Sequence, residues 1–377
     1  MFLKLKKKMI NLVLYRKYRP QTFAEVVGQD HVIKTLTSAL KTGKVAHAYL
    51  FAGPRGTGKT TVARLLAKAV NCLDDSSYEP CNKCESCLEI MNGRALDLIE
   101  IDAASNRGID EIRELRERVR FTPSRGKYKV FVIDEAHQLT KEAFNALLKT
   151  LEEPPAHAIF VLATTEPYKM LPTILSRVQR FDFKKVSLPD IIKRLGMIAQ
   201  KEKIKVSEKA LRIIALNSEG YMRDAESMLG QVIAFSASSA DKSGEITIED
   251  IENILGIVDI NLAIKFIDLL ANKKSSEALS FIDKFVNQGY DLVQFVESLI
   301  NYSRKLLLIR VNKDLSKLIK EELSQEQLNT ALKQAEEFSL QELSKMLEIF
   351  IEALYRMKRS SFPQIEIELA VVEICQR

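Results

Sequence analysis

The sequence predicts an α/β domain with a mainly parallel five-stranded sheet and helices on both faces, followed by two helical regions. Three observations lead to this prediction. Short apolar runs alternate with helical segments as far as residue 187, Leu188-Pro189 interrupts the alternation, and the rest of the chain has helical periodicity almost throughout. The predicted domains are therefore residues 1–187, 188–256 and 257–377.

Composition places the chain among ordinary globular proteins. It has 377 residues, of which 46% are hydrophobic and 28% are charged, and no apolar run approaches the length of a membrane span. Residues 1–19 carry seven Lys/Arg and no acid, and their apolar segment is too short for a signal peptide. We therefore expect a cytoplasmic protein without a membrane partner.

Five apolar runs are the predicted strands: residues 48–52, 97–102, 129–133, 158–163 and 180–183. A helix is predicted at about 31–42 and another over 61–70, directly after the first strand. The second region has helical segments at 191–202, 207–216, 223–235 and 248–255. In the third region, stripes such as Leu343, Met346, Leu347 and Phe350 have the spacing of packed helices, in a core or an oligomer interface.

A complete G-x-x-x-x-G-K-[ST] phosphate loop lies between the first strand and its helix. Its glycines allow several backbone N–H groups to point at one phosphate, and the helix N-terminus adds partial positive charge. Lys59 can reach the β- and γ-phosphates, and the Thr60 hydroxyl can ligate Mg²⁺. The predicted nucleotide-contacting residues are Gly53, Pro54, Arg55, Gly56, Thr57, Gly58, Lys59, Thr60 and Thr61.

Four cysteines follow the helix of the phosphate loop, with the spacing C-x8-C-x2-C-x2-C: Cys72, Cys81, Cys84 and Cys87. Four thiolates within sixteen residues suit a tetrahedral Zn²⁺ site. Disulfides are rare in cytosolic ATPases, and unpaired core cysteines do not fit so polar a segment. Four cysteine ligands leave no position for water, so we expect a structural site. Replacing Cys84 with serine is then expected to unfold the module without abolishing nucleotide binding.

Polar residues follow two other predicted strands. Asp134 and Glu135 follow the strand at 129–133, where Asp134 would hold Mg²⁺ through its water shell and Glu135 would accept a proton from the attacking water. Thr164 and Thr165 follow the strand at 158–163. A hydroxyl there could orient the water near the γ-phosphate, although a threonine at the end of a strand is also common.

The segment from Asn106 to Lys129 is basic, with eight Lys/Arg against four acids. Its predicted helix buries Ile109, Ile112, Leu115 and Val119, and its arginines lie off that stripe. Two interpretations stay open. The arginines form a solvated face with Glu/Arg pairs, or the helix N-terminus and its basic residues face nucleic-acid phosphates.

Together these motifs resemble the gamma/tau family of bacterial DNA polymerase III, the AAA+ ATPases of the replicative clamp loader. The resemblance covers nearly the whole chain from about Tyr15, and about ten lysine-rich residues precede the family's usual start. It includes the four-cysteine insertion and the phosphate loop. Its other carriers are residues 15–20 (YRKYRP), 27–29 (VGQ), 105–110 (SNRGID), 148–155 (LKTLEEPP) and 163–165 (ATT).

The resemblance implies roles that spacing could not give. Thr165 takes the sensor 1 position, Arg223 the sensor 2 position of a helical lid, and Arg177 the arginine finger that reaches the ATP of a neighbouring subunit. Val178 replaces the cysteine that follows this arginine in the family. The adenine pocket is expected around Tyr15, Arg16, Val26 and Val27.

As a whole, the resemblance implies an α/β AAA+ domain with an inserted zinc module, a helical lid domain and an all-α collar. The implied function is an ATP hydrolase of the clamp loader that uses ATP, Mg²⁺ and Zn²⁺. The implied partners are delta, delta-prime and further gamma/tau subunits, the sliding clamp, and primer–template DNA bound without sequence preference. The chain ends where the collar should end, which is expected of a gamma-type product and equally of a truncated chain. The alternatives are a non-catalytic delta-prime-type subunit, which typically has a degraded phosphate loop, and a helicase-type AAA+ motor, which should lack the cysteine insertion.

Overall fold

The computed structural model describes residues 13–74, 76–238, 245–255, 259–312, 314, 319 and 323–376. The ten or so lysine-rich residues that precede the family's usual start lie outside this part of the chain. The chain divides into two compact units, residues 1–245 and 246–377. Within the described residues, no helix is long and apolar enough to cross a bilayer.

The first unit is built on a parallel five-stranded sheet, as predicted, and its strand order is β2-β3-β4-β1-β5. Ala52 at the end of β1 lies opposite Thr164 of β4, and Asp102 of β2 lies opposite Asp134 of β3. The carboxyl ends of four strands therefore share one edge of the sheet. The strands are β1 (Ala48–Ala52), β2 (Leu98–Asp102), β3 (Lys129–Asp134), β4 (Ala158–Thr164) and β5 (Gln179–Asp182).

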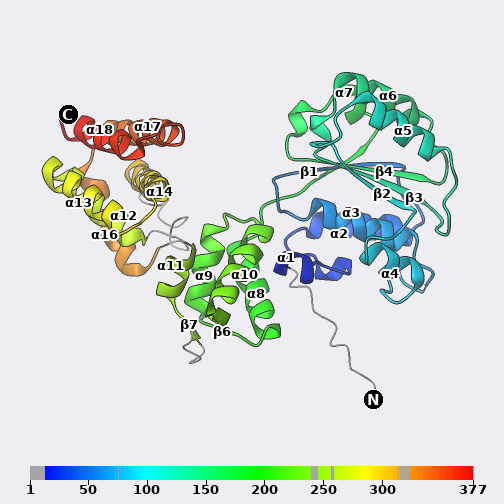
Figure 1. Cartoon of the computed structure of the whole chain (residues 1–377), viewed down its shortest axis with the longest axis horizontal. Coiled ribbons are helices and arrows are strands. Elements are labelled where there is room, and N and C mark those ends of the chain that lie inside the picture. The colour runs from blue at the N-terminus through cyan, green and yellow to red at the C-terminus, as the bar shows by residue number, and fades with distance from the viewer. Residues whose placement is uncertain are drawn as a thin grey trace, which may run out of the picture. The chain divides into compact units, whose positions relative to one another are not determined.

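Helices cover both faces of this sheet (Figure 1). On one face, α2 (Asp30–Lys41), α3 (Lys59–Val70) and α4 (Glu85–Met91) pack through a core that includes Leu36, Leu65 and Phe51. On the other face, α5 (Ile109–Val119), α6 (Lys141–Glu152) and α7 (Pro172–Leu175) pack on Phe131, Phe160 and their neighbours. Strands β1, β3 and β4 are almost wholly buried, which accounts for their continuous apolar runs.

Short helical elements complete this unit. They are α1 (Leu14–Lys17) and the 3₁₀ turns η1 (Phe23–Glu25), η2 (Ala136–Gln138) and η3 (Pro167–Lys169). A set of lid helices follows the sheet: α8 (Leu188–Lys201), α9 (Glu208–Asn217) and α10 (Met222–Ser238), with the short strand β6 (Lys205–Val206) between α8 and α9. The hydroxyls of Ser187 and Ser207 accept backbone N–H groups and cap α8 and α9. Three of the four helices predicted for the second region are therefore confirmed in this unit, with ends shifted by a few residues. The fourth, predicted at 248–255, also forms but belongs to the second unit.

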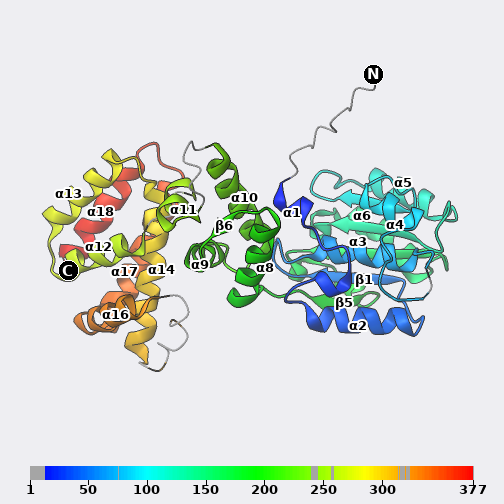
Figure 2. The same ribbon diagram turned by 90° about the horizontal axis from the view of Figure 1, so that it is seen from below.

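In the described part of the second unit the elements are helices, as predicted, apart from Ile246 in the short strand β7 (Glu245–Ile246). Figure 2 shows α12, α13 and α18 side by side. Its core contains Phe266, Phe295, Tyr302 and Phe350. The rings of Phe266 and Phe295 pack edge to face, with 5.1 Å between their centroids. Capping boxes start α16 and α17. The described helices are α11 (Ile248–Leu255), α12 (Ile260–Ala271), α13 (Ser275–Asn287), α14 (Leu292–Val311), α16 (Gln325–Glu337), α17 (Leu340–Met357) and α18 (Pro363–Gln376).

Candidate nucleotide-binding site and cysteine cluster

The phosphate loop connects the buried end of β1 to α3. Gly53 has φ +146°, and a Cβ atom there would lie only 2.4 Å from the carbonyl oxygen of Phe183. Gly58 has φ +101° and is the N-cap of α3, so Lys59 and Thr60 form the first turn of this helix. Both conformations strongly favour glycine. The loop therefore curls closely around the end of β1 and ends at a helix N-terminus, a geometry that binds phosphate groups.

Lys59 and Thr60 lie where the predicted chemistry requires them. The Thr60 hydroxyl donates to the Asp134 carboxylate at 2.9 Å, which brings the two predicted Mg²⁺ ligands together. Lys59 is only 5% exposed, and its ammonium donates to the carbonyls of Gly53 (2.7 Å) and Pro54 (2.8 Å). Burial lowers the pKa of Lys59, against the opposing effect of the Glu135 and Asp134 carboxylates.

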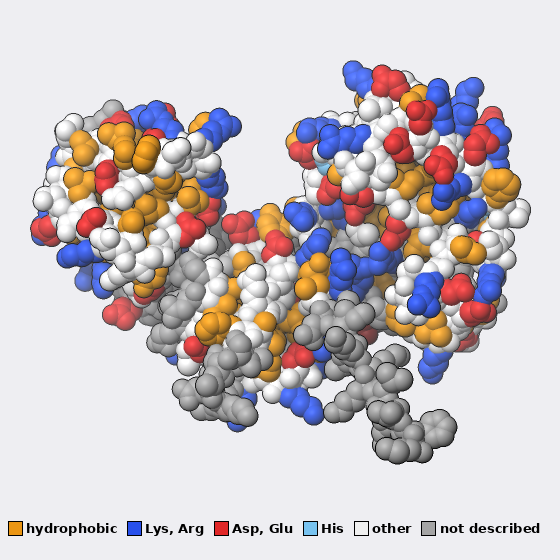
Figure 3. All heavy atoms as spheres, in the orientation of Figure 1, with side chains coloured by type: hydrophobic (Ala, Val, Ile, Leu, Met, Phe, Trp, Pro, Cys, Tyr) orange, Lys and Arg blue, Asp and Glu red, His pale blue; other side chains and the backbone are white. Residues whose placement is uncertain are grey.

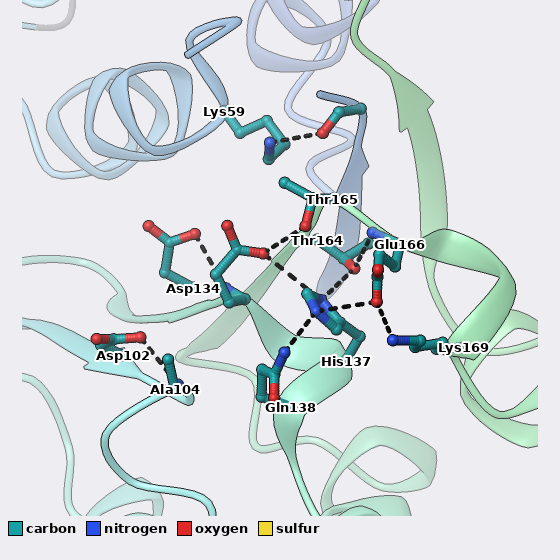
Figure 4. Close-up of polar contacts among 12 residues, drawn as sticks. Lys59, Asp102, Ala104, Asp134, His137, Gln138, Thr164, Thr165, Glu166 and Lys169 are labelled. Carbon is teal, nitrogen blue, oxygen red and sulfur yellow. Dashed lines mark hydrogen bonds and ion pairs between the residues drawn. The ribbon is translucent and has the colours of Figure 1, made fainter. Parts of the chain in front are cut away.

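Glu135 belongs to a polar network at the ends of β3 and β4, in which Figure 4 shows His137 beside Thr164 and Glu166. It has φ +46°, in the left-handed region, and its carboxylate accepts the hydroxyl of Thr165 at 2.9 Å. The imidazole of His137 lies behind it, with Nδ1 3.0 Å from Thr164 Oγ1 and 3.5 Å from the Glu135 carboxylate. Its Nε2 lies 3.4 Å from the carboxylate of Glu166. The structure thus brings Glu135 and Thr165 together and adds His137, to which the sequence analysis gave no role.

A cavity of about 230 Å³ opens in front of the phosphate loop. Three segments far apart in the sequence form its walls: the N-terminal segment, the loop with the end of β3, and the lid helices. Figure 3 shows Lys and Arg side chains gathered in this region. The lining residues are Tyr15, Arg16, Arg19, Pro20, Glu25, Val26, Val27, Arg55, Gly56, Thr57, Gly58, Lys59, Thr60, Thr61, Asp134, Glu135, Val186, Arg194, Met222, Arg223 and Glu226.

Arg223, the predicted sensor 2 residue, lies in the first turn of the lid helix α10 and faces the N-terminal segment. Its guanidinium lies 4.6 Å from the centre of the Tyr15 ring, within cation–π distance. The hydrogen bond to Arg223 lowers the pKa of Tyr15. The predicted adenine-pocket residues and the predicted sensor 2 residue therefore line one cavity, although their roles stay predictions.

Arg177 lies elsewhere. It follows α7, is not among the residues that line the cavity, and its guanidinium pairs with the Glu152 carboxylate at 2.7 Å. The same side chain donates to the carbonyl of Thr173 and to the hydroxyl of Ser176. Its side chain is 33% exposed. Arg177 thus lies outside the residues that line the cavity and is partly exposed, and its role in trans stays a prediction.

Sequence reasoning missed part of the cavity wall, including Arg19, Arg194 and Glu226. Arg194 and Glu226 form a buried ion pair, with 3.2 Å between Nε and Oε1, and Arg194 also donates to the carbonyl of Tyr18. Burial raises the pKa of Glu226, and the Arg194 charge opposes the shift. A signal was present in the sequence. Arg194 falls on the apolar face of α8 between Ile191 and Leu195, where a charged residue needs a buried partner.

The four cysteines converge between α3 and α4. Their sulfur atoms all lie within 4.8 Å of one another, and the Sγ atoms of Cys72 and Cys87 are 3.8 Å apart. Zn–S bonds of about 2.3 Å in a tetrahedron place sulfurs about 3.8 Å apart. The cysteines form no disulfide. Backbone N–H groups of Lys83 and Cys84 lower the pKa of the Cys81 thiol to about 6, whereas burial raises the pKa of Cys72 and Cys87. The donor set therefore fits Zn²⁺.

Three family models match successive parts of the chain. Residues 28–187 match "DNA polymerase III, delta subunit", residues 190–238 match "DNA polymerase III clamp loader subunit, ATPase lid domain", and residues 246–377 match "DNA polymerase III subunits gamma and tau domain III". The matched ranges together extend over most of the chain.

Curated relatives agree with these models. DNA polymerase III subunit tau of Bacillus subtilis is 46% identical over 96% of this chain and 63% of its own length. Subunit tau of Escherichia coli is 40% identical over 80% of this chain and 46% of its length, and subunit gamma/tau of Mycobacterium tuberculosis H37Rv is 36% identical over 97% and 62%. The chain thus spans less than two thirds of the length of each relative. It belongs to the family of DNA polymerase III gamma and tau subunits.

Proposed function

We propose that this chain is an ATPase subunit of the replicative clamp loader, which uses ATP binding and hydrolysis to open a sliding clamp and load it on primer–template DNA. The observation that carries the proposal is the arrangement at the carboxyl edge of the sheet. Thr60 and Asp134 meet at 2.9 Å, and Glu135 and Thr165 meet at 2.9 Å beside them. The lid description of the matching family model and the names of the relatives support it.

The proposed chemistry follows from the positions of these groups. The loop N–H groups and Lys59 would bind the β- and γ-phosphates, and Thr60 and Asp134 would hold Mg²⁺, whose charge neutralises the phosphate oxygens. Glu135 would accept a proton from the attacking water, and Thr165 would hold that carboxylate in place. The four cysteines would bind a structural Zn²⁺.

We propose that Arg177 acts in trans, on ATP held by the adjacent subunit. Its place outside its own cavity supports this role. Arg223 would contact the phosphates from the lid as sensor 2. The division into a nucleotide-binding domain (1–187), a lid (188–256) and a collar (257–377) belongs to the same proposal, as do the delta, delta-prime, gamma/tau, clamp and DNA partners.

We propose that α5 faces DNA, and that the N-terminus of this helix and its basic residues contact the phosphates. Of the two interpretations of its arginines, ion pairing holds for Arg113, Arg118 and Arg120, which pair with Asp110, Glu114 and Glu117. These exposed pairs are worth little and exchange readily with phosphate oxygens. DNA affinity should therefore fall steeply with salt and depend little on base sequence.

A delta-prime-type scaffold remains the second candidate because residues 28–187 match a delta-subunit model. A scaffold that does not hydrolyse ATP has no need of the complete set Lys59, Thr60, Asp134 and Glu135. Turnover by an assembly in which only this chain carries an intact site separates the two candidates. A strand-displacement assay tests the helicase-type motor.

The deciding experiment replaces Arg177 with glutamine in the reconstituted loader. An arginine finger typically contributes roughly 10³–10⁵ in rate, so DNA-stimulated ATP turnover should fall by at least about 10³ while ATP affinity stays the same. Arg180→Gln is the matched control, since Arg180 is an exposed arginine on β5 that pairs with Asp182. Unchanged turnover in Arg177→Gln would reject the trans role.

A further inference from the structure

The loop between the first two cysteines contacts the N-terminal segment. Glu79, two residues before Cys81, accepts the backbone N–H of Phe23 at 2.8 Å and that of Ala24 at 3.1 Å. These two residues belong to the 3₁₀ turn η1, and the residues directly after them, Glu25, Val26 and Val27, line the cavity. One carboxylate of the cysteine module therefore holds the turn from which part of the nucleotide pocket is built.

Lys68 makes a second connection from the helix that carries the phosphate loop. It lies nine residues after Lys59, is only 2% exposed, and donates to the carbonyl oxygen of Gln21 (3.1 Å) and to its side-chain oxygen (2.9 Å). It also donates to the side-chain oxygen of Asn82, between Cys81 and Cys84. Lys68 thus joins the cysteine module to the N-terminal segment.

Gln21 in turn is hydrogen-bonded to residues that line the cavity. Its side-chain amide donates to the carbonyl of Arg19 at 2.9 Å, and its backbone N–H donates to the Glu25 carboxylate at 2.7 Å. Arg19 and Glu25 both line the cavity. Two separate sets of hydrogen bonds, through Glu79 and through Lys68, therefore hold residues 19–25 against the cysteine module.

We propose that the cysteine module holds the N-terminal wall of the nucleotide pocket in position, with Glu79 and Lys68 as positioning residues. Metal binding and nucleotide binding then favour each other. This inference rests on the proposed nucleotide binding. Glu79 precedes Cys81 and Asn82 follows it, so both are held in place by the clustered cysteines, and loss of the metal frees both contacts. Linkage then requires that nucleotide raise the affinity for the metal by the same factor.

Electrostatics supports the role of Lys68. A Zn²⁺ ion with four thiolates carries a net charge of −2, and a buried charge needs a nearby partner. Burial lowers the pKa of Lys68, and the negative charges of Cys87, Glu25, Cys72 and Cys81 oppose this shift by favouring its charged form. The same ammonium therefore compensates the metal site and fixes Gln21.

The coupling changes one expectation drawn from the sequence, that loss of the module would leave nucleotide binding intact. Zinc-loaded and chelator-stripped wild-type chains are titrated with a fluorescent N-methylanthraniloyl-ATP in the presence of Mg²⁺. We expect the Kd of the stripped chain to be at least about fivefold higher, the low end of typical coupling. Competition with a chromophoric chelator, with and without ATP, should show the reciprocal gain in zinc affinity.

Glu79→Gln tests the contact without removing the metal, because it turns one of the two accepting oxygens into an NH₂ donor that faces a backbone N–H. Its matched control is Glu85→Gln, the same change in the same module, where the side chain pairs with Arg125 and not with the N-terminal segment. We expect weaker nucleotide binding for Glu79→Gln only, with zinc content unchanged. Lys68→Met should weaken both nucleotide binding and zinc retention.

The outcomes separate this inference from the function on which it rests. If the zinc-loaded wild type binds no nucleotide, the proposed function is wrong and the coupling with it. If it binds nucleotide equally well with and without zinc, and Glu79→Gln matches Glu85→Gln, the coupling alone is rejected. Circular dichroism of each variant confirms that the sheet is folded, and a variant that is not folded is replaced by the zinc-stripped comparison.

Discussion

Gly53→Ala tests how closely the phosphate loop is packed on the sheet. Gly53 follows β1 with φ +146°, and an added Cβ would lie 2.4 Å from the carbonyl oxygen and 2.9 Å from the Cβ of Phe183. The added Cβ would meet the backbone of Phe183. This backbone is held in place because the Phe183 N–H donates to the carbonyl of Ala52 at 2.7 Å. Neither side can yield without disturbing the end of β1.

The expected loss in the free energy of unfolding of Gly53→Ala has two parts. A disfavoured backbone conformation costs about 1–3 kcal/mol, and overpacking against a fixed neighbour about 1–3 kcal/mol more. Gly43→Ala is the control, because Gly43 has φ +66° and a Cβ there would meet no atom within 4 Å. It should lose only about 1–2 kcal/mol. Urea unfolding of the two variants measures the difference. Equal midpoints would refute the argument, as would unchanged nucleotide affinity in Gly53→Ala.

Three further predictions concern the chemistry. Glu135→Gln should retain nucleotide affinity but lower kcat by at least about 10², the usual contribution of a general base, and a fall in affinity alone would contradict this. Thr60→Val should raise the Mg²⁺ concentration needed for half-maximal turnover, because it removes the hydroxyl beside Asp134; an unchanged Mg²⁺ titration would count against it. Burial lowers the pKa of Lys59 from 10.5, and bound phosphate would favour its charged form. Binding should therefore take up a proton at alkaline pH and weaken as pH rises, and Lys59→Met should lack this alkaline decline.

Sequence patterns located the residues whose chemistry demands a local arrangement. The phosphate loop needs particular residues at successive positions, so Gly53 to Thr60 could be identified without a structure. Buried strands such as Ala48–Ala52 and Ala158–Thr164 were equally clear, because a parallel strand buried on both faces is continuously apolar. In the same way, the close spacing of the cysteines predicted a cluster that the structure brings within 4.8 Å.

Long-range contacts left no such pattern. Residues 48–55 gave no indication that Gly53 lies against Phe183, and Glu79 has no sequence feature that marks it as the partner of Phe23, 56 residues away. No helix is predicted over residues 141–152, where the structure has α6 (Lys141–Glu152); only residues 148–155 are named, for the family resemblance. Arg177 is a different case. Its role depends on a neighbouring molecule, so geometry within one chain can support that role but cannot supply its partner.

The buried pair Arg194–Glu226 shows what the cavity wall requires of the lid. Replacing a buried ion pair with apolar residues of similar size is often neutral or stabilising, so stability alone does not explain this one. Arg194, however, also donates to the carbonyl of Tyr18, a bond that no apolar side chain could make. Through it, α8 and α10 of the lid and the N-terminal segment meet at a single guanidinium beside the nucleotide cavity. A shift of the lid must therefore move the N-terminal wall or break this junction, so a nucleotide that orders one of the two also orders the other.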